Sequence, residues 1–303
     1  MTRPRRRRGP SHPMRTPGTP RGSADSQAAP APVIAPPTSA PEMSHTVLSI
    51  AGLDPSGGAG VAADLKTIAA YRHHGAAVVT SVTAQNTLGI QAIYDLPYEF
   101  VAQQIESVVS DLSIAAVKIG MLGTARTAEL VAALIHSLEL RHVVLDPVLR
   151  STTGTPLMEP AGLEVVRNQL LPRVEVITPN MEEAQALTGT RVTDLGSMKD
   201  AAHILHEMGA RHVVVTGGHL GQRAIDVLFD GERTAVFSSS KITSNSTHGI
   251  GCTFSTAVAC QLARGMDVAE AVDSAKRYVA RAVTHAGKIG RGAGPLNHLV
   301  SPF

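Results

Sequence analysis

TVLSIAGLDPSGGAGVAADLKTIAAYRHHGAAVVTSV, residues 46–82, holds two apolar, β-branched runs separated by a glycine-rich turn and a helical stretch. A strand–helix–strand unit of this kind places its two strands parallel in one sheet. Similar runs continue along the chain as AAVKIG, HVVLDPV, VEVITP and HVVVTGG, while AIDVLF and TAVFSS follow each other directly and predict a local antiparallel edge. The sequence therefore predicts an α/β fold of three layers, α/β/α, with a mostly parallel central sheet covered on both faces.

The composition is that of a globular protein with a sizeable core. Of the 303 residues 43% are hydrophobic, yet no apolar run approaches the roughly 20 residues that cross a bilayer. Trp is absent and aromatic residues make up 3%, which argues against a stacking platform for nucleic acid. We therefore expect neither a membrane nor a nucleic acid as a partner.

The N-terminal stretch differs from the rest of the chain. Residues 1–43 hold ten of the 19 prolines, and residues 1–44 carry seven arginines against two acidic residues. Such a stretch buries little apolar area, so we expect a disordered tail over residues 1–43 and a folded domain over residues 44–303. The prolines argue against the amphipathic helix of a transit peptide. A solvated tail is favoured over an arm that binds nucleic acid.

Both cysteines, Cys252 and Cys260, fall in one predicted helix. A rise of about 1.5 Å per residue separates them by roughly 12 Å, which is too far for a disulfide. No CxxC pair or His/Cys cluster in the sequence suggests a metal site. These features indicate a reducing, cytoplasmic environment.

Unusual residues follow most of the predicted strands, and the carboxyl ends of such strands are where ligands bind. DPSGGAG, residues 54–60, lets bare backbone approach a ligand, although an ordinary strand–helix turn explains it equally well. Gln85 ends the second strand, and its amide could pair with an amino group beside a ring nitrogen. A satisfied loop residue is the commoner role for such a glutamine.

Three further polar residues offer oxygen ligands to Mg²⁺ or to its waters. Asp146 ends an apolar strand, and Asn180 and Glu183 follow the next one. Asn180 and Glu183 also have the spacing of a capping box at a helix start, and that structural role is favoured for them. Asp146 is the stronger candidate for a metal ligand.

STHGIGCTFS, residues 246–255, predicts an anion hole. Gly249 and Gly251 let the chain curl before a helix that begins near Cys252, and a helix start presents unpaired N–H groups and a positive dipole end. We expect this setting to lower the pKa of Cys252 and to make it partly thiolate. Taken alone, Cys252 would be a small buried residue at a tight helix start.

Seven segments in this order resemble the hydroxymethylpyrimidine/phosphomethylpyrimidine kinases of thiamine biosynthesis, within the ribokinase-like superfamily. They are AGLDPSGGAGVAADLKT, TSVTAQNT, VKIGML, LDPV, TPNMEEAQALTG, GGH and STHGIGCT. The resemblance implies a ribokinase-like fold and ATP-dependent phosphorylation of 4-amino-5-hydroxymethyl-2-methylpyrimidine to its monophosphate and then to its diphosphate. Mg²⁺ as cofactor and a homodimer are expected with it.

The resemblance also implies roles for individual residues. Gln85 would recognise the aminopyrimidine in a pocket lined by Gly52, Ala59, Met121 and Val148. Cys252 would act as the base, and the turn through Gly249 and Gly251 would hold the phosphoryl group being transferred. Asp146 would bind the metal, and the contacts to ATP would come from Asn180, Glu183, Thr216 and Gly218.

Two positions depart from the family pattern, and two other functions compete. Thr216 stands where the family often has a lysine on the ATP phosphates, so weaker affinity for ATP is expected. Ile250 stands where the family usually has threonine, which removes no backbone N–H. A pyridoxal or pyridoxine kinase is the nearest alternative, because pyridoxine also carries a ring hydroxymethyl group. A non-catalytic protein that binds a vitamin precursor is disfavoured, because binding alone needs no phosphoryl site.

Overall fold

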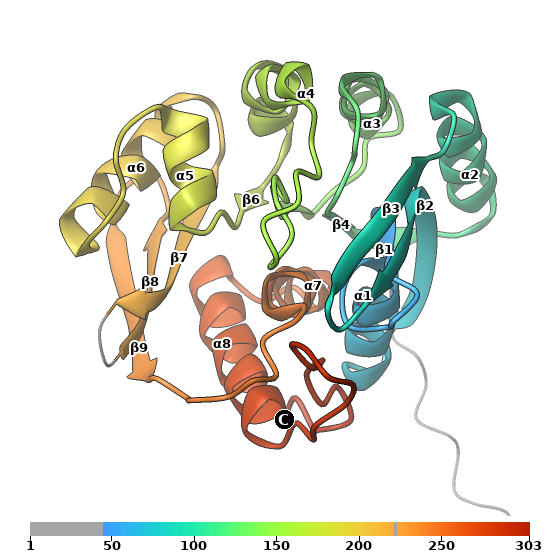
Figure 1. Ribbon diagram of the computed structural model, residues 1–303. Coiled ribbons are helices and arrows are strands. Elements are labelled where there is room, and N and C mark those ends of the chain that lie inside the picture. The colour runs from blue at the N-terminus through green and yellow to red at the C-terminus, as the bar shows by residue number, and fades with distance from the viewer. Residues whose placement is uncertain (1–44, 221–222) are drawn as a thin grey trace, which may run out of the picture. The chain divides into compact units, whose positions relative to one another are not determined.

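The computed structural model describes residues 45–220 and 223–303, whose strands form one sheet with helices on both faces (Figure 1). The predicted tail, residues 1–43, lies outside the described residues. Within the described chain the strand order is β3-β2-β1-β4-β5-β6-β7-β8-β9. The strands are β1 (Thr46–Leu53), β2 (His74–Asn86), β3 (Gly89–Asp95), β4 (Ile114–Ile119), β5 (Val143–Leu145), β6 (Val176–Ile177), β7 (His212–Leu220), β8 (Arg223–Phe229) and β9 (Thr234–Ser240).

The pairing of the strands confirms a mostly parallel sheet. Every pair from β2 through β1, β4, β5 and β6 to β7 is parallel. The antiparallel edge predicted from AIDVLF and TAVFSS is present as β8 and β9. At the other edge β3, which the sequence did not predict, pairs antiparallel with β2. As a result β2 continues to Asn86, and Gln85 lies within the strand rather than in a loop beyond it.

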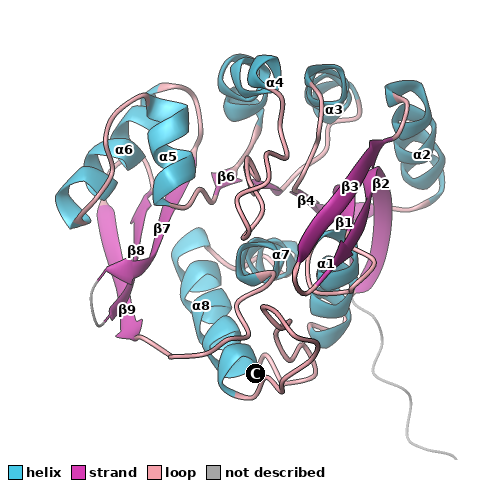
Figure 2. Cartoon of the chain, in the orientation of Figure 1, coloured by secondary structure: helices cyan, strands magenta, loops and turns pink. Residues whose placement is uncertain are grey.

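The helices form the two outer layers (Figure 2). They are α1 (Gly60–Ala70), α2 (Tyr98–Asp111), α3 (Ala125–Ser137), α4 (Pro160–Val165) with a π turn (Val166–Leu170) and a 3₁₀ turn (Leu171–Arg173), α5 (Met181–Thr188), α6 (Leu195–Glu207), α7 (Ile250–Ala263) and α8 (Val268–Thr284). Helices α2 to α6 lie on one face, and α1, α7 and α8 lie on the other (Figure 1).

Alternation along the strands explains the two layers. On β1, Leu48 and Ile50 pack in the cluster with α2 to α6, whereas Val47 packs in the cluster with α1, α7 and α8. All three side chains are almost fully buried. A strand covered on both faces needs apolar residues in both orientations, which is why β1 is a nearly continuous apolar run.

Two central strands are very short, and their early ends matter for the site. β5 ends at Leu145 and β6 at Ile177, so Asp146 and Thr178 already begin the loops at the carboxyl ends of the strands. Further along the second of these loops, Asn180 bridges to Thr216 on β7. Helix α7 packs against β4 and β5, which places its N-terminus near the middle of the sheet. In the described residues no helix combines the length and apolar character needed to cross a membrane.

Candidate active site

The start of α7 has the geometry predicted for an anion hole. Gly249 precedes the helix with φ of 85°, in the left-handed region that glycine tolerates. The backbone N–H of Thr253 closes the first turn on the carbonyl of Gly249. The N–H groups before Thr253 have no intrahelical acceptor, so those of Ile250, Gly251 and Cys252 are available to an anion.

The glycine loop, residues 54–60, is organised around the carboxylate of Asp54. This carboxylate accepts hydrogen bonds from the backbone N–H groups of Ser56, Gly58 and Ala59 at 2.8, 3.1 and 3.0 Å. It also accepts one from the Nε2 of His248 at 2.7 Å. Burial would raise the pKa of Asp54, but the hydrogen bonds from His248 and Ser56 lower it to about 2. The carboxylate is therefore ionised and holds the loop.

The glycine loop and the α7 turn are in direct contact. A Cβ on Gly249 would overlap the carbonyl of Gly58, and a Cβ on Gly58 would overlap the ring of His248. Glycine at both positions therefore lets the two segments approach closely. Together with the Asp54–His248 hydrogen bond, this contact makes one unit of segments nearly 200 residues apart in sequence.

Gln85 lies beside this unit. Its amide nitrogen is 3.3 Å from the Nε2 of His248, and its amide oxygen accepts from the hydroxyl of Thr83 at 3.1 Å. Gln85, His248 and Thr152 line one small cavity of about 10 Å³. That volume is about one water probe, so a pyrimidine ring enters only when the lining segments move apart.

The predicted thiolate at Cys252 is wrong. Burial raises the pKa of Cys252 to about 12, and the neighbouring carboxylates of Asp146 and Asp64 add to the increase, although Lys118 opposes it. The sulfur accepts a hydrogen bond from the backbone N–H of Gly60, and the side chain is hydrogen-bonded to Asp146. Cys252 is therefore a thiol that donates to a carboxylate, because burial of the sulfur and the charge of the neighbouring carboxylates outweigh the helix dipole.

A buried ion pair lies beneath the anion hole. The ammonium of Lys118 is 2.9 Å from Asp64 and 4.0 Å from Asp146, and none of its side chain is exposed. Asp64 also accepts hydrogen bonds from Ser49 and Thr256 at 2.6 and 2.8 Å. Burial alone would lower the pKa of Lys118, but the carboxylate of Asp64 raises it above its usual value. Lys118 is thus a fixed cation under the start of α7.

Asp146 and Glu183 fit a Mg²⁺ ion held mainly by phosphates and water. Burial raises the pKa of both, and the charge of Asp146 raises that of Glu183 further. Two buried carboxyl groups that repel each other are a setting in which a cation is favourable. Among the described residues no three His, Cys, Asp or Glu side chains gather in a metal cluster. Mg²⁺ commonly uses only one or two protein carboxylates, so the chemistry of this pair is compatible with it.

Asn180 and Glu183 have the predicted structural role. Asn180 caps α5 by accepting from the N–H of Glu183 at 2.9 Å, and the carboxylate of Glu183 accepts from the N–H of Asn180 at 2.9 Å. The N–H of Thr216 donates to the carbonyl of Pro179 at 2.8 Å, which brings Thr216 to the same place. Gly218 lies two residues further along β7 and is exposed. These residues therefore gather at the β6–β7 side of the sheet, away from Gln85.

The predicted lining residues have these neighbours in the fold. A Cβ on Gly52 would meet the sulfur of Met121, so these two are neighbours. Ala59 caps α1 and lies against Gly249. Val148 is half-buried just beyond Asp146, and its N–H donates to the carbonyl of Asp146.

Sequence reasoning missed three residues of this site, namely Asp54, His248 and Lys118. All three lie inside the quoted segments DPSGGAG, STHGIGC and VKIGML. The available signal was a charged or titratable residue inside a glycine-rich turn or at the end of an apolar strand. Such residues are rarely buried unless they are paired.

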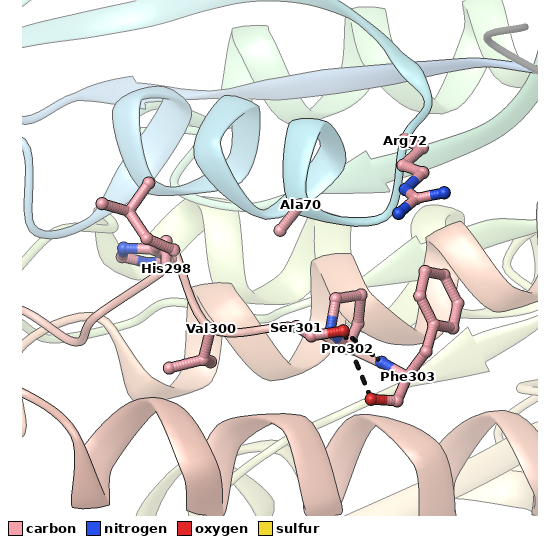
Figure 3. Close-up of a pocket in the computed structure, with 8 residues that line it drawn as sticks. Ala70, Arg72, His298, Val300, Ser301, Pro302 and Phe303 are labelled. Carbon is pink, nitrogen blue, oxygen red and sulfur yellow. Dashed lines mark hydrogen bonds between the residues drawn. The ribbon is translucent and has the colours of Figure 1, made fainter. Parts of the chain in front are cut away.

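A larger cavity lies at the opposite end of α1 (Figure 3). Its volume is about 180 Å³. The glycine loop precedes α1, whereas this cavity adjoins the residues that end it, so the two lie at different ends of the helix. Its lining consists of Ala70, Arg72, His298, Leu299, Val300, Ser301, Pro302 and Phe303.

Comparison with known proteins identifies the family of the chain. The family model described as phosphomethylpyrimidine kinase matches residues 54–297. A hydroxymethylpyrimidine/phosphomethylpyrimidine kinase of Streptomyces coelicolor is 43% identical over 89% of this chain and 97% of its own length. The thiamine biosynthesis bifunctional protein ThiED of Geobacter sulfurreducens is 43% identical over 86% of this chain, which spans 54% of that relative.

Solved structures show the same fold. The ADP complex of Bacillus subtilis pyridoxal kinase is similar with a TM-score of 0.78 and 36% identity, covering 84% of this chain and 97% of that one. The phosphomethylpyrimidine kinase of Clostridium difficile is similar with a TM-score of 0.71 and 35% identity, covering 79% and 100%. The described residues thus have the three-layer fold that the sequence predicts.

Proposed function

Because the chain belongs to the phosphomethylpyrimidine kinase family, we propose that it transfers a phosphoryl group from ATP to 4-amino-5-hydroxymethyl-2-methylpyrimidine and then another to the monophosphate. The observation that carries this proposal is the position of Gln85 beside the start of α7, with His248 between them. An amide suited to an aminopyrimidine thereby adjoins an anion hole suited to a phosphoryl group. Thiamine biosynthesis, named for the Geobacter relative, is the pathway this reaction would serve.

The anion hole lies between an acceptor side and a nucleotide side. Gln85 on β2 marks the acceptor side, and Asn180, Thr216 and Gly218 near β6 and β7 mark the nucleotide side. Helix α7 packs on β4 and β5 between them. A phosphoryl group moving from one side to the other would pass the N–H groups of Ile250, Gly251 and Cys252, which stabilise its charge.

Buried side chains would balance the remaining negative charge of the phosphates. Asp146 and Glu183 would hold Mg²⁺, which neutralises phosphate charge when bound. The ammonium of Lys118 lies close to the carboxylates of Asp64 and Asp146, and its charge adds positive potential below the anion hole. Thr216 supplies a hydroxyl but no charge to the phosphates, so we expect ATP to bind more weakly than where a lysine stands there.

Cys252 contributes to positioning more than to proton removal. Its thiol donates to Asp146 and its sulfur accepts from Gly60, so it is not a ready base in the resting enzyme. Phosphoryl transfer through a loose transition state needs mainly positioning and charge stabilisation. The alcohol can therefore keep its proton until late in the transfer.

The direct test is a kinase assay on the purified full chain. The chain is incubated with ATP, Mg²⁺ and either the pyrimidine alcohol or its monophosphate, and the products are separated and identified. We expect ADP together with the monophosphate and then the diphosphate. Turnover of pyridoxal with none of either pyrimidine would reject the proposal.

Pyridoxal phosphorylation is the second candidate, because the Bacillus subtilis and Staphylococcus aureus pyridoxal kinases share the fold at a TM-score of 0.78. Pyridoxal lacks an amino group beside a ring nitrogen, so the paired donor and acceptor of the Gln85 amide suit it less well. The substitution Gln85→Leu separates the two activities. It should lower affinity for the pyrimidine about tenfold to a hundredfold and leave pyridoxal turnover largely unchanged.

We also propose a cytoplasmic homodimer. Both cysteines are free, which suits a reducing compartment. Val82 and Tyr94 pair across β2 and β3 and are exposed by 37% and 66%, so they offer an apolar patch to a second copy. Light scattering on the purified chain tests the dimer, and a monomeric mass at micromolar concentration would reject it.

A further inference from the structure

The hydrogen bonds of His248 fix its ring and its tautomer. Its Nε2 is 2.7 Å from the ionised carboxylate of Asp54, so this nitrogen carries the hydrogen and donates it. In an imidazole whose hydrogen is on Nε2, Nδ1 is the acceptor. The contact at Nδ1 is the hydroxyl of Thr152 at 3.5 Å, the outer limit of a hydrogen bond.

Thr152 is a partner that a ligand can displace. It is exposed, on the loop between β5 and α4, whereas His248 is only 7% exposed. Both line the cavity of about 10 Å³ beside Gln85, which must widen to admit a ring. Moving Thr152 away would free Nδ1 while Asp54 keeps the ring of His248 in place.

The substrate chemistry points to the same nitrogen. In 4-amino-5-hydroxymethyl-2-methylpyrimidine the amino group and the hydroxymethyl group are on adjacent ring carbons. The protein groups that contact them must therefore be neighbours as well. His248 is 3.3 Å from the Gln85 amide and precedes Gly249 of the anion hole, so it lies between the two subsites.

We propose that His248 is a substrate-contacting specificity residue, whose Nδ1 accepts a hydrogen bond from the hydroxymethyl group. The inference rests on the proposed function and assigns the hydroxyl contact to His248 rather than to Cys252. The sulfur of Cys252 already accepts from Gly60, and its thiol hydrogen bonds to Asp146. Nδ1 is the nearby acceptor whose own partner is weak and exposed.

Calorimetry with two ligands tests the contact in the full chain. One ligand is the pyrimidine alcohol, and the other carries methyl in place of hydroxymethyl. His248→Gln keeps a donor at the position of Nε2, and thus the bond to Asp54, but removes Nδ1. Loss of one hydrogen bond should weaken binding of the alcohol about five- to tenfold and change binding of the methyl analogue less than twofold.

Two further variants make the result specific. His248→Asn keeps a polar atom near the position of Nδ1 and should recover most of the affinity for the alcohol. Gln85→Leu should weaken both ligands alike, because both carry the aminopyrimidine edge. Thermal melting of each variant confirms that it is folded, and the ¹⁵N shift of Nδ1 in the wild-type chain, followed on addition of each ligand, needs no variant.

The outcomes separate this inference from the proposed function. Equal weakening of both ligands in His248→Gln, or a shift of Nδ1 that is the same with both ligands, would overturn the hydroxyl contact alone. Failure of the wild-type chain to bind either pyrimidine would overturn the proposed function and the contact with it. Selective loss for the alcohol supports both.

Discussion

At the scale of single residues, the state of Cys252 decides how the acceptor is activated. A thiol with a pKa of about 12 forms little thiolate near neutral pH. We expect alkylation of Cys252 by iodoacetamide to speed up about tenfold for each pH unit from 7 to 10, with no plateau. Cys252→Ser is the control, because it leaves only Cys260, which is fully buried. A plateau with a midpoint below pH 8 would show that the helix dipole dominates after all.

The error at Cys252 shows what local sequence lacks. The turn GIGC predicts the N–H groups and the dipole, and these are present. Burial of the thiol opposes them first, and the carboxylates of Asp64 and Asp146, which arrive from α1 and from the end of β5, add to it. Likewise, 194 residues separate Asp54 from His248, and neither segment predicts a contact with the other. Types of site residue were predictable, but the pairings that set their charge were not.

At the scale of elements, the two ends of α7 offer a matched pair of glycines. Gly249 and Gly265 have φ of 85° and 82°, so alanine costs about 1–2 kcal/mol of stability at either position. Only at Gly249 would the added Cβ strike another segment, the carbonyl of Gly58. Gly249→Ala should therefore reduce kcat about 10²–10³-fold, as loss of an anion hole does.

Gly265→Ala is the control for that experiment, since no atom lies within 4 Å of its added Cβ. It should lower the melting temperature through backbone strain alone and leave kcat within about twofold of wild type, because strain at the far end of α7 does not reach the N–H groups. Similar losses of kcat in both variants would mean that α7 acts through its stability and not through the turn.

A comparison of helices α5 and α6 can distinguish a capping role of Asn180 from a role in ATP binding. Both α5 and α6 begin with capping boxes, built on Asn180 and on Asp194. Alanine at either cap should cost about 1 kcal/mol in the free energy of unfolding by urea. Only Asn180→Ala should also raise the KM for ATP, because its side chain lies on the proposed nucleotide side, where the backbone of Asn180 bridges to that of Thr216. An unchanged KM would leave Asn180 a cap and nothing more.

The elements themselves were largely predictable from periodicity. β1, β4 and β7 are apolar because helices cover both their faces, so their runs are visible in the sequence. β3 was missed because it lies at an edge and all its residues are exposed or half-buried. β5 and β6 were predicted too long, since Asp146 and Thr178 leave the sheet for the site. A strand is therefore shorter where the polar residue at its end turns toward the site.

At the scale of the whole molecule, we expect the folded part to need little from residues 1–43. The sheet of the described residues begins at Thr46, and the family match begins at residue 54. We expect deletion of residues 1–43 to change turnover by less than about twofold, since a proline- and arginine-rich segment buries little apolar area. A tenfold fall in turnover or a loss of solubility would show that the segment packs on the domain.

The pH dependence of stability has two opposing sources. Burial, and after it nearby positive charge, lowers the pKa of His73 and His298 to about 4. Because the unfolded chain gains these protons near pH 6.5, both histidines stabilise the fold above that pH, and the contribution is lost as pH falls toward 4. Glu183 acts in the opposite direction. Its pKa is raised, so its contribution is complete below its unfolded value and is lost as pH rises.

Substitution resolves these opposing contributions. His298 is 5% exposed. Its Nε2 shares a hydrogen bond of 3.0 Å with the hydroxyl of Thr253, and a glutamine side chain can keep this bond. Between pH 5 and pH 7 its titration should supply about 2 kcal/mol of added stability, since each pKa unit corresponds to about 1.4 kcal/mol. The free energy of unfolding of His298→Gln, measured with urea, should therefore rise about 2 kcal/mol less from pH 5 to pH 7 than that of the wild type.

Glu183→Gln should have the opposite effect on the same difference, because it removes a group that destabilises the fold as pH rises. Parallel pH profiles for the wild type and both variants would show that neither group titrates differently in the folded and unfolded chains.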